Sequence, residues 1–121
     1  MAKKFGISTL LRNKLISDDT LNGLISNKVY PIVAPEGTEG NYVIYYRDRY
    51  SRDRTKVGIM DTADVVFAVI SDDYDTSQLI AETIDNVLDG YHSGIGTVYL
   101  KDSTEDLIDK KYTQILIYSI F

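Results

Sequence analysis

The chain contains no cysteine and no tryptophan, and it has a single histidine, His92, and only two prolines. Without cysteine it can form neither a disulfide framework nor a thiolate metal site, and it has no cysteine nucleophile. Its apolar runs are far shorter than the roughly 20 residues that a membrane-spanning helix needs. The first six residues, Met-Ala-Lys-Lys-Phe-Gly, also lack the apolar stretch of a secretory signal. We therefore expect a soluble protein inside a cell, or part of a particle assembled there, with no membrane partner.

What is present is the composition of an ordinary globular domain. The 121 residues are 44% hydrophobic and 26% charged. A chain of this length buries about two-thirds of its unfolded surface, which is enough for one core. We therefore expect one domain that spans residues 1–121, without linkers, internal repeats or low-complexity tracts.

Positive and negative charges are separated along the chain. Residues 57–100 contain eight acidic residues and no lysine or arginine. Residues 47–56 hold four of the five arginines, Lys56 and two aspartates, which gives this short stretch a net charge of +3 within a chain of net charge −5. Such separation favours head-to-tail self-association or contact with a charged polymer.

Both prolines fall within residues 29–46, which are the most informative stretch of the sequence. Neither Pro31 nor Pro35 can donate a backbone hydrogen bond, so neither fits the middle of a paired central strand. Gly37 and Gly40 follow, and an alternating apolar run then begins at Tyr42. The pattern predicts a short strand over residues 28–33, a constrained loop and a second strand.

That second strand, over residues 41–52, begins apolar on both faces and turns basic from Arg47 onward. A strand that starts in a core and ends in charge is expected to project from the fold as an arm. Residues 51–60 would form the tip, with Gly58 helping the chain to return. Residues 61–71 alternate apolar side chains on both faces, which predicts the buried returning strand.

Apolar residues at helical spacing occur both before and after this hairpin. Residues 7–17 predict an amphipathic helix, and residues 21–25 a shorter turn capped by Asp18, Asp19 and Thr20. A third helix is expected to begin at Asp75 as N-cap, with Gln78 completing a capping box, and to stop near Gly90. Its apolar stripe comprises Leu79, Ile80, Ile84, Val87 and Leu88.

The remaining residues predict two more strands. We expect a short strand over residues 97–101 and a longer strand with alternating apolar side chains over residues 111–121. Between them, residues 102–110 are expected to form a polar connection with one helical turn near residues 105–108. The fold class that results is α+β, with a mainly antiparallel β-sheet, a long β-hairpin arm and two main helices packed on one face.

No catalytic, cofactor or metal site stands out. His92 lies beside Ser93, but adjacent loop residues rarely adopt the geometry of a base and its nucleophile. Gly94-Ile-Gly96 precedes a strand rather than opening a helix, which is the wrong context for a phosphate loop. An acidic cluster formed by Asp72, Asp73 and Asp75 could hold a hard cation, but helix capping is the favoured interpretation. We expect no enzyme activity and no cofactor.

The basic segment 47–56 is the candidate functional site. Three interpretations apply: docking onto an acidic partner such as residues 57–100 of another copy, a solvated hairpin whose arginines pair with Asp48 and Asp53, and phosphate binding with a tyrosine stacked on a base. Because the chain is acidic overall, docking is ranked first and nucleic acid third. The expected interface residues are Arg47, Arg49, Tyr50, Arg52, Arg54 and Lys56.

Ten tyrosines provide apolar area with a polar tip, which suits interfaces as well as half-buried sheets. Tyr50 and Tyr91 have polar neighbours in the sequence and are the better interface candidates. Most of the others are expected to be core-facing strand residues, in particular Tyr42, Tyr46, Tyr112 and Tyr118.

The order of these motifs resembles a known family. An N-terminal helix precedes Lys28-Val-Tyr-Pro31, Ala34-Pro-Glu-Gly37 and Tyr42-Val-Ile-Tyr-Tyr46, and the likeness continues through residues 64–71, Tyr74-Asp75, Leu88-Asp-Gly90 and a closing strand with Tyr112 and Tyr118. Together these resemble the tail-completion proteins of long-tailed phages and prophages, which include tail terminators and tail-to-head joining proteins.

The resemblance implies a ring, usually a hexamer, that caps the tail tube in the virion after assembly in the host cytoplasm. Its partners would be other copies of itself, the tube protein and the head–tail connector, with DNA only as passing cargo. The family has no catalytic residues to transfer to this chain. The alternative function is a nucleic-acid-binding module that uses the basic segment 47–56.

Overall fold

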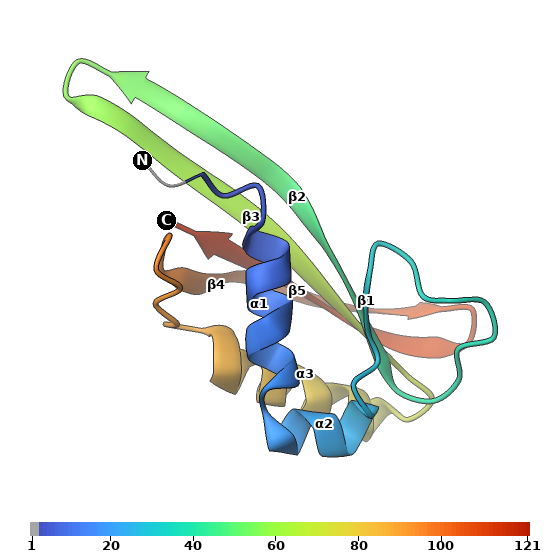
Figure 1. The fold of residues 1–121 in the computed structure, drawn as a ribbon. Coiled ribbons are helices and arrows are strands. Elements are labelled where there is room, and N and C mark those ends of the chain that lie inside the picture. Colours follow the sequence, from blue (N-terminus) through green and yellow to red (C-terminus); the bar gives the residue numbers. More distant parts are fainter. Residues whose placement is uncertain (1–2) are drawn as a thin grey trace.

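The computed structural model describes residues 3–121, which form three helices and five strands (Figure 1). Their order is α1 (Ile7–Ile16), α2 (Asp19–Ile25), β1 (Val29–Pro31), β2 (Tyr42–Thr55), β3 (Gly58–Ser71), α3 (Tyr74–Leu88), β4 (Val98–Ile108) and β5 (Lys111–Ile120). None of the helices in residues 3–121 has the length and apolarity that crossing a membrane would require.

The five strands form one sheet in the order β1-β2-β3-β5-β4. Every neighbouring pair is antiparallel except β1 and β2, which run parallel through Val29, Tyr30 and Pro31. The helices lie together on one side of the sheet, and the β2–β3 hairpin extends well past the other strands (Figure 1). The expected α+β class, the mainly antiparallel sheet and the long hairpin arm are confirmed.

The core lies between the helices and the sheet face that they cover. Phe67 of β3 sits at its centre, with its ring 6.0 Å from those of Tyr45 on β2 and Tyr118 on β5. Tyr118 is fully buried and donates its hydroxyl hydrogen to Asp85 of α3, 2.9 Å away. Burial and this carboxylate both raise the pKa of the Tyr118 hydroxyl above its ordinary value. The helices contribute the fully buried Leu11, Leu15, Ile80, Ile84 and Leu88.

The other sheet face carries no helix, and we call it the open face. Because side chains alternate along a strand, it presents the residues between those of the core. They are mostly apolar, and their exposure varies: Val66 and Ile70 are buried, Tyr46 is exposed, and Tyr42, Ile44, Ala68, Ile115 and Ile117 are half-buried. The prediction that Tyr42 and Tyr46 face the core is therefore wrong. Tyr112 lies on the same side of β5 as Tyr118, but it is exposed and its ring packs against that of Tyr74 at 5.5 Å. Of the four predicted tyrosines, only Tyr118 belongs to the core. Tyr45 takes the core position on β2.

Helix α3 begins two residues earlier than the sequence predicted. Asp73, and not Asp75, is the N-cap, and its carboxylate accepts a hydrogen bond from the backbone N–H of Thr76 at 2.9 Å. This places Asp75 in the first turn, so the capping box with Gln78 does not form. Leu79 also turns away from the core, where its place is taken by the small polar residues Ser77 and Thr83.

Strand β4 is much longer than the sequence predicted. Residues 102–108 continue the strand instead of forming a polar connection with a helical turn, and β4 is joined to β5 by a tight turn at Asp109 and Lys110, both at positive φ. All of β4 beyond Val98 is exposed because it forms the edge of the sheet. An exposed edge strand has no buried face, so it shows no apolar alternation.

The opposite edge is formed by β1, which is shorter than predicted. It ends at Pro31, and the next residue, Ile32, adopts φ +67 while its N–H donates to the carbonyl oxygen of Tyr45 at 2.8 Å. The expected role of Pro31 in a sheet-edge strand is borne out, with Pro35 in the loop that follows.

Candidate functional site

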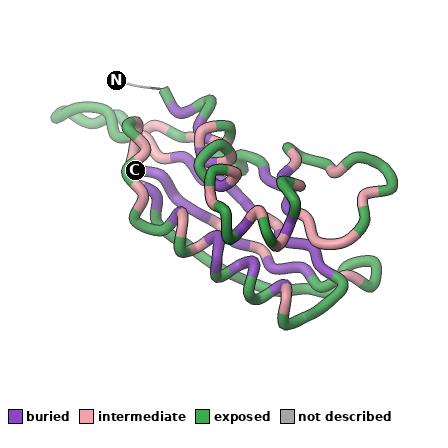
Figure 2. Tube along the Cα trace, turned by 60° about the horizontal axis from the view of Figure 1, so that its bottom comes forward, coloured by how far each residue is buried: buried purple, intermediate pink, exposed green. Residues whose placement is uncertain are grey.

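The candidate site is the arm, which we define as residues 51–62, the part of the β2–β3 hairpin that has no third strand beside it. The last pair between β3 and β5 joins Ala63 to Ile120. Beyond it, five residue pairs continue the hairpin alone, from Ser51 with Thr62 to Thr55 with Gly58. At about 3.3 Å per residue, the arm extends roughly 17 Å past its neighbours. Residues 53–60 are all exposed, as Figure 2 shows.

A β-bulge separates the arm from the rest of the sheet. Arg47 pairs with Val65, but the next pair joins Arg49 to Asp64, so Asp48 is an extra residue in β2. Arg47 therefore lies on the helix side, where its guanidinium donates to the carbonyl oxygen of Phe5 at 2.8 Å and stacks over the Phe5 ring at 5.0 Å. Arg49 lies on the open face, and the bulge thus divides the basic segment between two sides.

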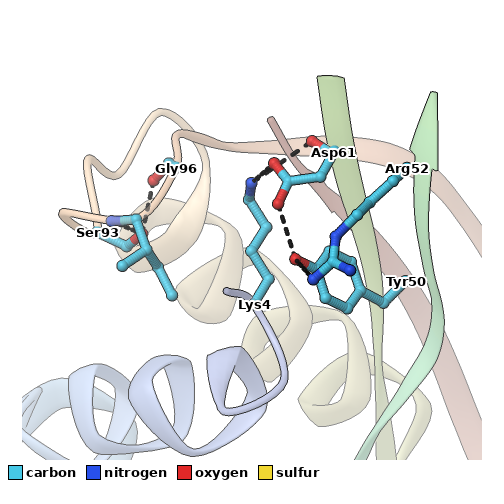
Figure 3. A network of polar contacts seen from close by, with 7 residues as sticks. Lys4, Tyr50, Arg52, Asp61, Ser93 and Gly96 are labelled. Atoms are coloured by element: carbon cyan, nitrogen blue, oxygen red, sulfur yellow. Dashed lines mark hydrogen bonds and ion pairs between the residues drawn. The ribbon is translucent and has the colours of Figure 1, made fainter. Parts of the chain in front are cut away.

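A polar network fastens the base of the arm to the N-terminal segment (Figure 3). Asp61 of β3 forms an ion pair with Lys4, and both side chains are almost completely buried. The second carboxylate oxygen of Asp61 accepts a hydrogen bond from the Tyr50 hydroxyl at 2.8 Å. Arg52 donates to the Tyr50 oxygen at 3.2 Å, and Phe5 meets the Tyr50 ring edge-on at 5.0 Å. Side chains from β2 and from the N-terminal segment thus bond to the same carboxylate, that of Asp61 on β3.

The electrostatics of this network favour the charged form of Asp61. The hydrogen bond from Lys4 has the largest effect and lowers the pKa of the Asp61 carboxyl; burial opposes it, and the Tyr50 hydrogen bond adds to the lowering. The network therefore holds a stable ion pair at neutral pH, and its residues serve to position the arm.

A second carboxylate, Asp64, lies on the open face just below the arm. It accepts hydrogen bonds from Ser119 at 2.6 Å and from Lys101 at 3.0 Å. Burial acts to raise the pKa of Asp64, but these hydrogen bonds and the charges of Lys101 and Arg49 leave it below its ordinary value. The Arg49 charge is thus partly compensated inside the chain.

The tip of the arm has a different character, because it joins positive charge to exposed apolar surface. Val57 in the two-residue turn is 97% exposed, and Met60 is 70% exposed. Ile59 is also exposed, and Arg54 and Lys56 stand beside these residues in no ion pair with the part of the chain that the structure describes. Exposed apolar residues gathered at the end of a projection are typical of a surface that is covered by a partner.

The six residues expected at the interface therefore fall into two groups. Arg47, Tyr50 and Arg52 contact residues of this chain at the base of the arm, while Arg49, Arg54 and Lys56 point to solvent. Lys4 and Asp61 were not predicted as site residues, because they lie 57 positions apart and no local pattern connects them. Val57, Ile59 and Met60 were not predicted either, although apolar residues in a predicted hairpin tip are a signal visible in the sequence.

The remaining candidates from the sequence, the acidic cluster near α3 and the His92–Ser93 pair, contact other residues of this chain. Asp72 pairs with Lys111, Asp73 caps α3, and no group of three or more potential metal ligands occurs in residues 3–121. His92 Nδ1 lies 2.9 Å from the Thr97 hydroxyl, whereas the Ser93 hydroxyl donates to the carbonyl of Gly96 at 2.6 Å. The Ser93 hydroxyl is thus bonded to a backbone carbonyl rather than to the His92 ring.

Comparison with known proteins shows a likeness among solved structures. No protein-family model matches the chain, and no curated protein sequence matches it. Among solved structures, the fold is similar to that of a chain in the virion of a native gene transfer agent particle, with a TM-score of 0.79 and 19% sequence identity. The match covers 98% of this chain and 97% of the other. At this identity the likeness establishes a shared fold.

Proposed function

We propose that this chain is a structural protein of a phage-like particle, and that it acts as a tail-completion protein that caps the tail tube as a ring. Two observations support the proposal. The fold matches a virion chain over nearly the full length of both, and the sequence motifs independently resemble the tail-terminator family. The ring would end tube growth and offer a surface to the head–tail connector, with DNA passing through its centre.

The observation that carries the proposal is the arm. It projects from the fold, its base is joined to the N-terminal segment through Lys4 and Asp61, and its tip exposes Val57 and Met60 beside cations that form no ion pair within residues 3–121. An element built this way contacts another molecule. When the contacted surface is a different part of an identical chain, the interface is head-to-tail and generates a closed ring or a filament.

Negative-stain microscopy with and without the tail-tube protein tests this function. We expect rings, six-membered in the family it resembles, either in solution or only on the ends of tubes. Tubes polymerised with the protein should be shorter and closed at one end. A chain that stays monomeric and leaves the length and ends of tubes unchanged would rule out the capping role.

The alternative, a nucleic-acid-binding module, keeps some support from Arg49, Arg54 and Lys56. It is weakened because the Tyr50 ring is packed against Phe5 and its hydroxyl is bound to Asp61, so the tyrosine is not free to stack on a base. Titration with DNA at several salt concentrations distinguishes the two. Binding that falls steeply with salt, and that is lost when the arm cations are reversed, would favour this alternative.

A further inference from the structure

The open face contains a hollow at the end of the sheet farthest from the arm tip. It has a volume of about 250 Å³ and is lined mainly by apolar side chains, among them Tyr42, Ile44, Ala68, Ile70 and Ile108. Small-molecule sites in proteins usually measure about 300–1,000 Å³. The hollow is therefore better suited to one or two side chains of a partner than to a cofactor.

Acidic groups border this hollow on the side of β4. Asp109 lines it directly, and Asp106 pairs with Thr113, another of its lining residues. Lys111 also lines it, but its charge is committed to Asp72. Neither Asp106 nor Asp109 joins an ion pair within residues 3–121. Lys110 stands beside Asp109 in the turn, so the charged residues around the hollow are three aspartates, Asp72, Asp106 and Asp109, against two lysines. The hollow thus combines an apolar floor with a small excess of negative charge, and it favours an occupant that is apolar and positively charged.

The arm tip has that combination of properties. Val57 is the most exposed large apolar residue among those described, and it follows Lys56 directly in the turn. Arg54 is close behind it on β2, and Ile59 and Met60 follow on β3. The arm tip and the hollow, which lie at opposite ends of the hairpin, are therefore both apolar and opposite in charge.

The arm of the same chain cannot fill the hollow. Tyr42 and Val57 lie near opposite ends of the continuous β2 hairpin, which at about 3.3 Å per residue places them on the order of 45 Å apart. Figure 1 shows the arm tip and the far end of the sheet at opposite extremes of the molecule. The occupant must therefore come from another molecule.

We propose that the hollow on the open face receives the arm tip of a second copy of this chain, with Val57 entering the apolar floor and Arg54 and Lys56 lying near Asp106 and Asp109. The inference rests on the self-association in the proposed function and names the surface that accepts the arm. Because the donor and acceptor surfaces differ, each copy gives its arm to one neighbour and receives the arm of another.

The absence of cysteine permits a direct test. One preparation carries Val57→Cys and the other Ala68→Cys, at the tip and in the hollow. The two are mixed under the conditions in which assembly is observed by light scattering or on tubes, and are treated with a short thiol-reactive cross-linker. The matched control replaces Val57→Cys by Val33→Cys, since Val33 is also a solvent-exposed valine, 71% exposed, but lies in the β1–β2 loop.

We expect a cross-linked dimer from the Val57→Cys and Ala68→Cys mixture, at least fivefold above that from the control mixture. The chain with both substitutions should give a ladder of higher products. If assembly occurs but the two mixtures cross-link equally, the arm docks elsewhere and this inference is wrong, while the proposed ring survives. If neither solution nor tube shows assembly, the proposed function and the inference both fail.

Discussion

Tyr50 on β2 and Asp61 on β3 are joined by a hydrogen bond of 2.8 Å at the level where the third strand of the sheet ends. An isolated two-stranded ribbon is marginally stable in water. Here the same carboxylate also holds the ammonium group of Lys4, so the N-terminal segment supports the ribbon at its base. The arm is thus held in position within the chain itself, which would reduce the entropy cost of the proposed docking.

Replacing Asp61→Asn should destabilise the fold. The change leaves the buried ammonium of Lys4 without a counter-charge, and loss of one partner of a buried ion pair typically costs about 3–5 kcal/mol. We expect about 3 kcal/mol by urea denaturation, since the amide can still accept the Tyr50 hydrogen bond. Asp53→Asn, an exposed aspartate on the same arm, is the control and should change stability by less than about 0.5 kcal/mol. Equal effects of the two variants would show that the ion pair does not stabilise the arm.

The same carboxylate should make stability depend on pH. Lys4 lowers the folded-state pKa of Asp61 below the ordinary value of 3.8, so the folded state binds this proton less readily than the unfolded chain. The stabilisation is therefore complete above the ordinary pKa and is lost as the pH falls through the folded-state pKa.

The difference in unfolding free energy between the parent chain and Asp61→Asn isolates this effect, because other carboxylates contribute to both. We expect the difference to be constant above about pH 5 and to shrink below about pH 4. Urea titrations at several pH values measure it. A difference that grows as the pH falls would have the wrong sign for the Lys4–Asp61 pair.

Reversal of the tip cations should impair assembly without affecting the fold. Arg54→Glu with Lys56→Glu alters two exposed residues that form no ion pair within the described chain, so the melting temperature should stay within about 2 °C. We expect at least tenfold weaker assembly by light scattering or tube capping. Arg52 is unsuitable for this purpose, because its guanidinium stacks on Tyr50 and contacts the Tyr50 hydroxyl.

The control is Lys3→Glu with Arg12→Glu, which changes the net charge by the same amount away from the arm. If the control impairs assembly as strongly, the effect reflects overall charge and the arm has no special part in it.

Gly96 should tolerate no side chain. A Cβ atom there would lie 2.6 Å from the Ile120 side chain and 2.7 Å from the carbonyl oxygen of Phe121, closer than such atoms approach. We expect Gly96→Ala to cost about 1–3 kcal/mol in urea denaturation, the usual range for overpacking. Gly6→Ala is the control, since a Cβ at that position meets nothing within 4 Å. A neutral Gly96→Ala would mean that the C-terminal residues move aside at little cost.

Local patterns were sufficient to predict the sheet centre and most helix positions. Residues 61–71 have apolar side chains on both faces, and β3 is indeed buried on both over most of this stretch, as a central strand of the sheet. The start of α3 was misplaced by two residues because Asp72, Asp73 and Asp75 are chemically alike, and only the backbone decides which one caps. Only the first residues of β4 were predicted. Its continuation over residues 102–108 was missed because β4 is an edge strand whose side chains are exposed, so they show no apolar alternation.

The candidate site was predicted in location but not in organisation. The clustered arginines of residues 47–56 marked the arm, whereas its division into a fastened base and a free tip depends on Lys4 and Phe5, more than 40 residues away. The open face could not be foreseen either. Apolar residues on both faces of β2 and β3 indicate burial on both sides, but the helices cover only one.

The bulge at Asp48 affects the direction of the arm. Removal of Asp48 would make β2 regular and keep the pairs of Arg47 with Val65 and of Arg49 with Asp64, so each later side chain would remain on its present side. What would be lost is the bend and the added twist that an extra residue gives a strand. One residue therefore controls the direction in which the arm points, and other residues control what it binds. The direction of the arm and the chemistry of its tip can therefore change independently, and in the proposed ring the same tip would suit assemblies of different diameter.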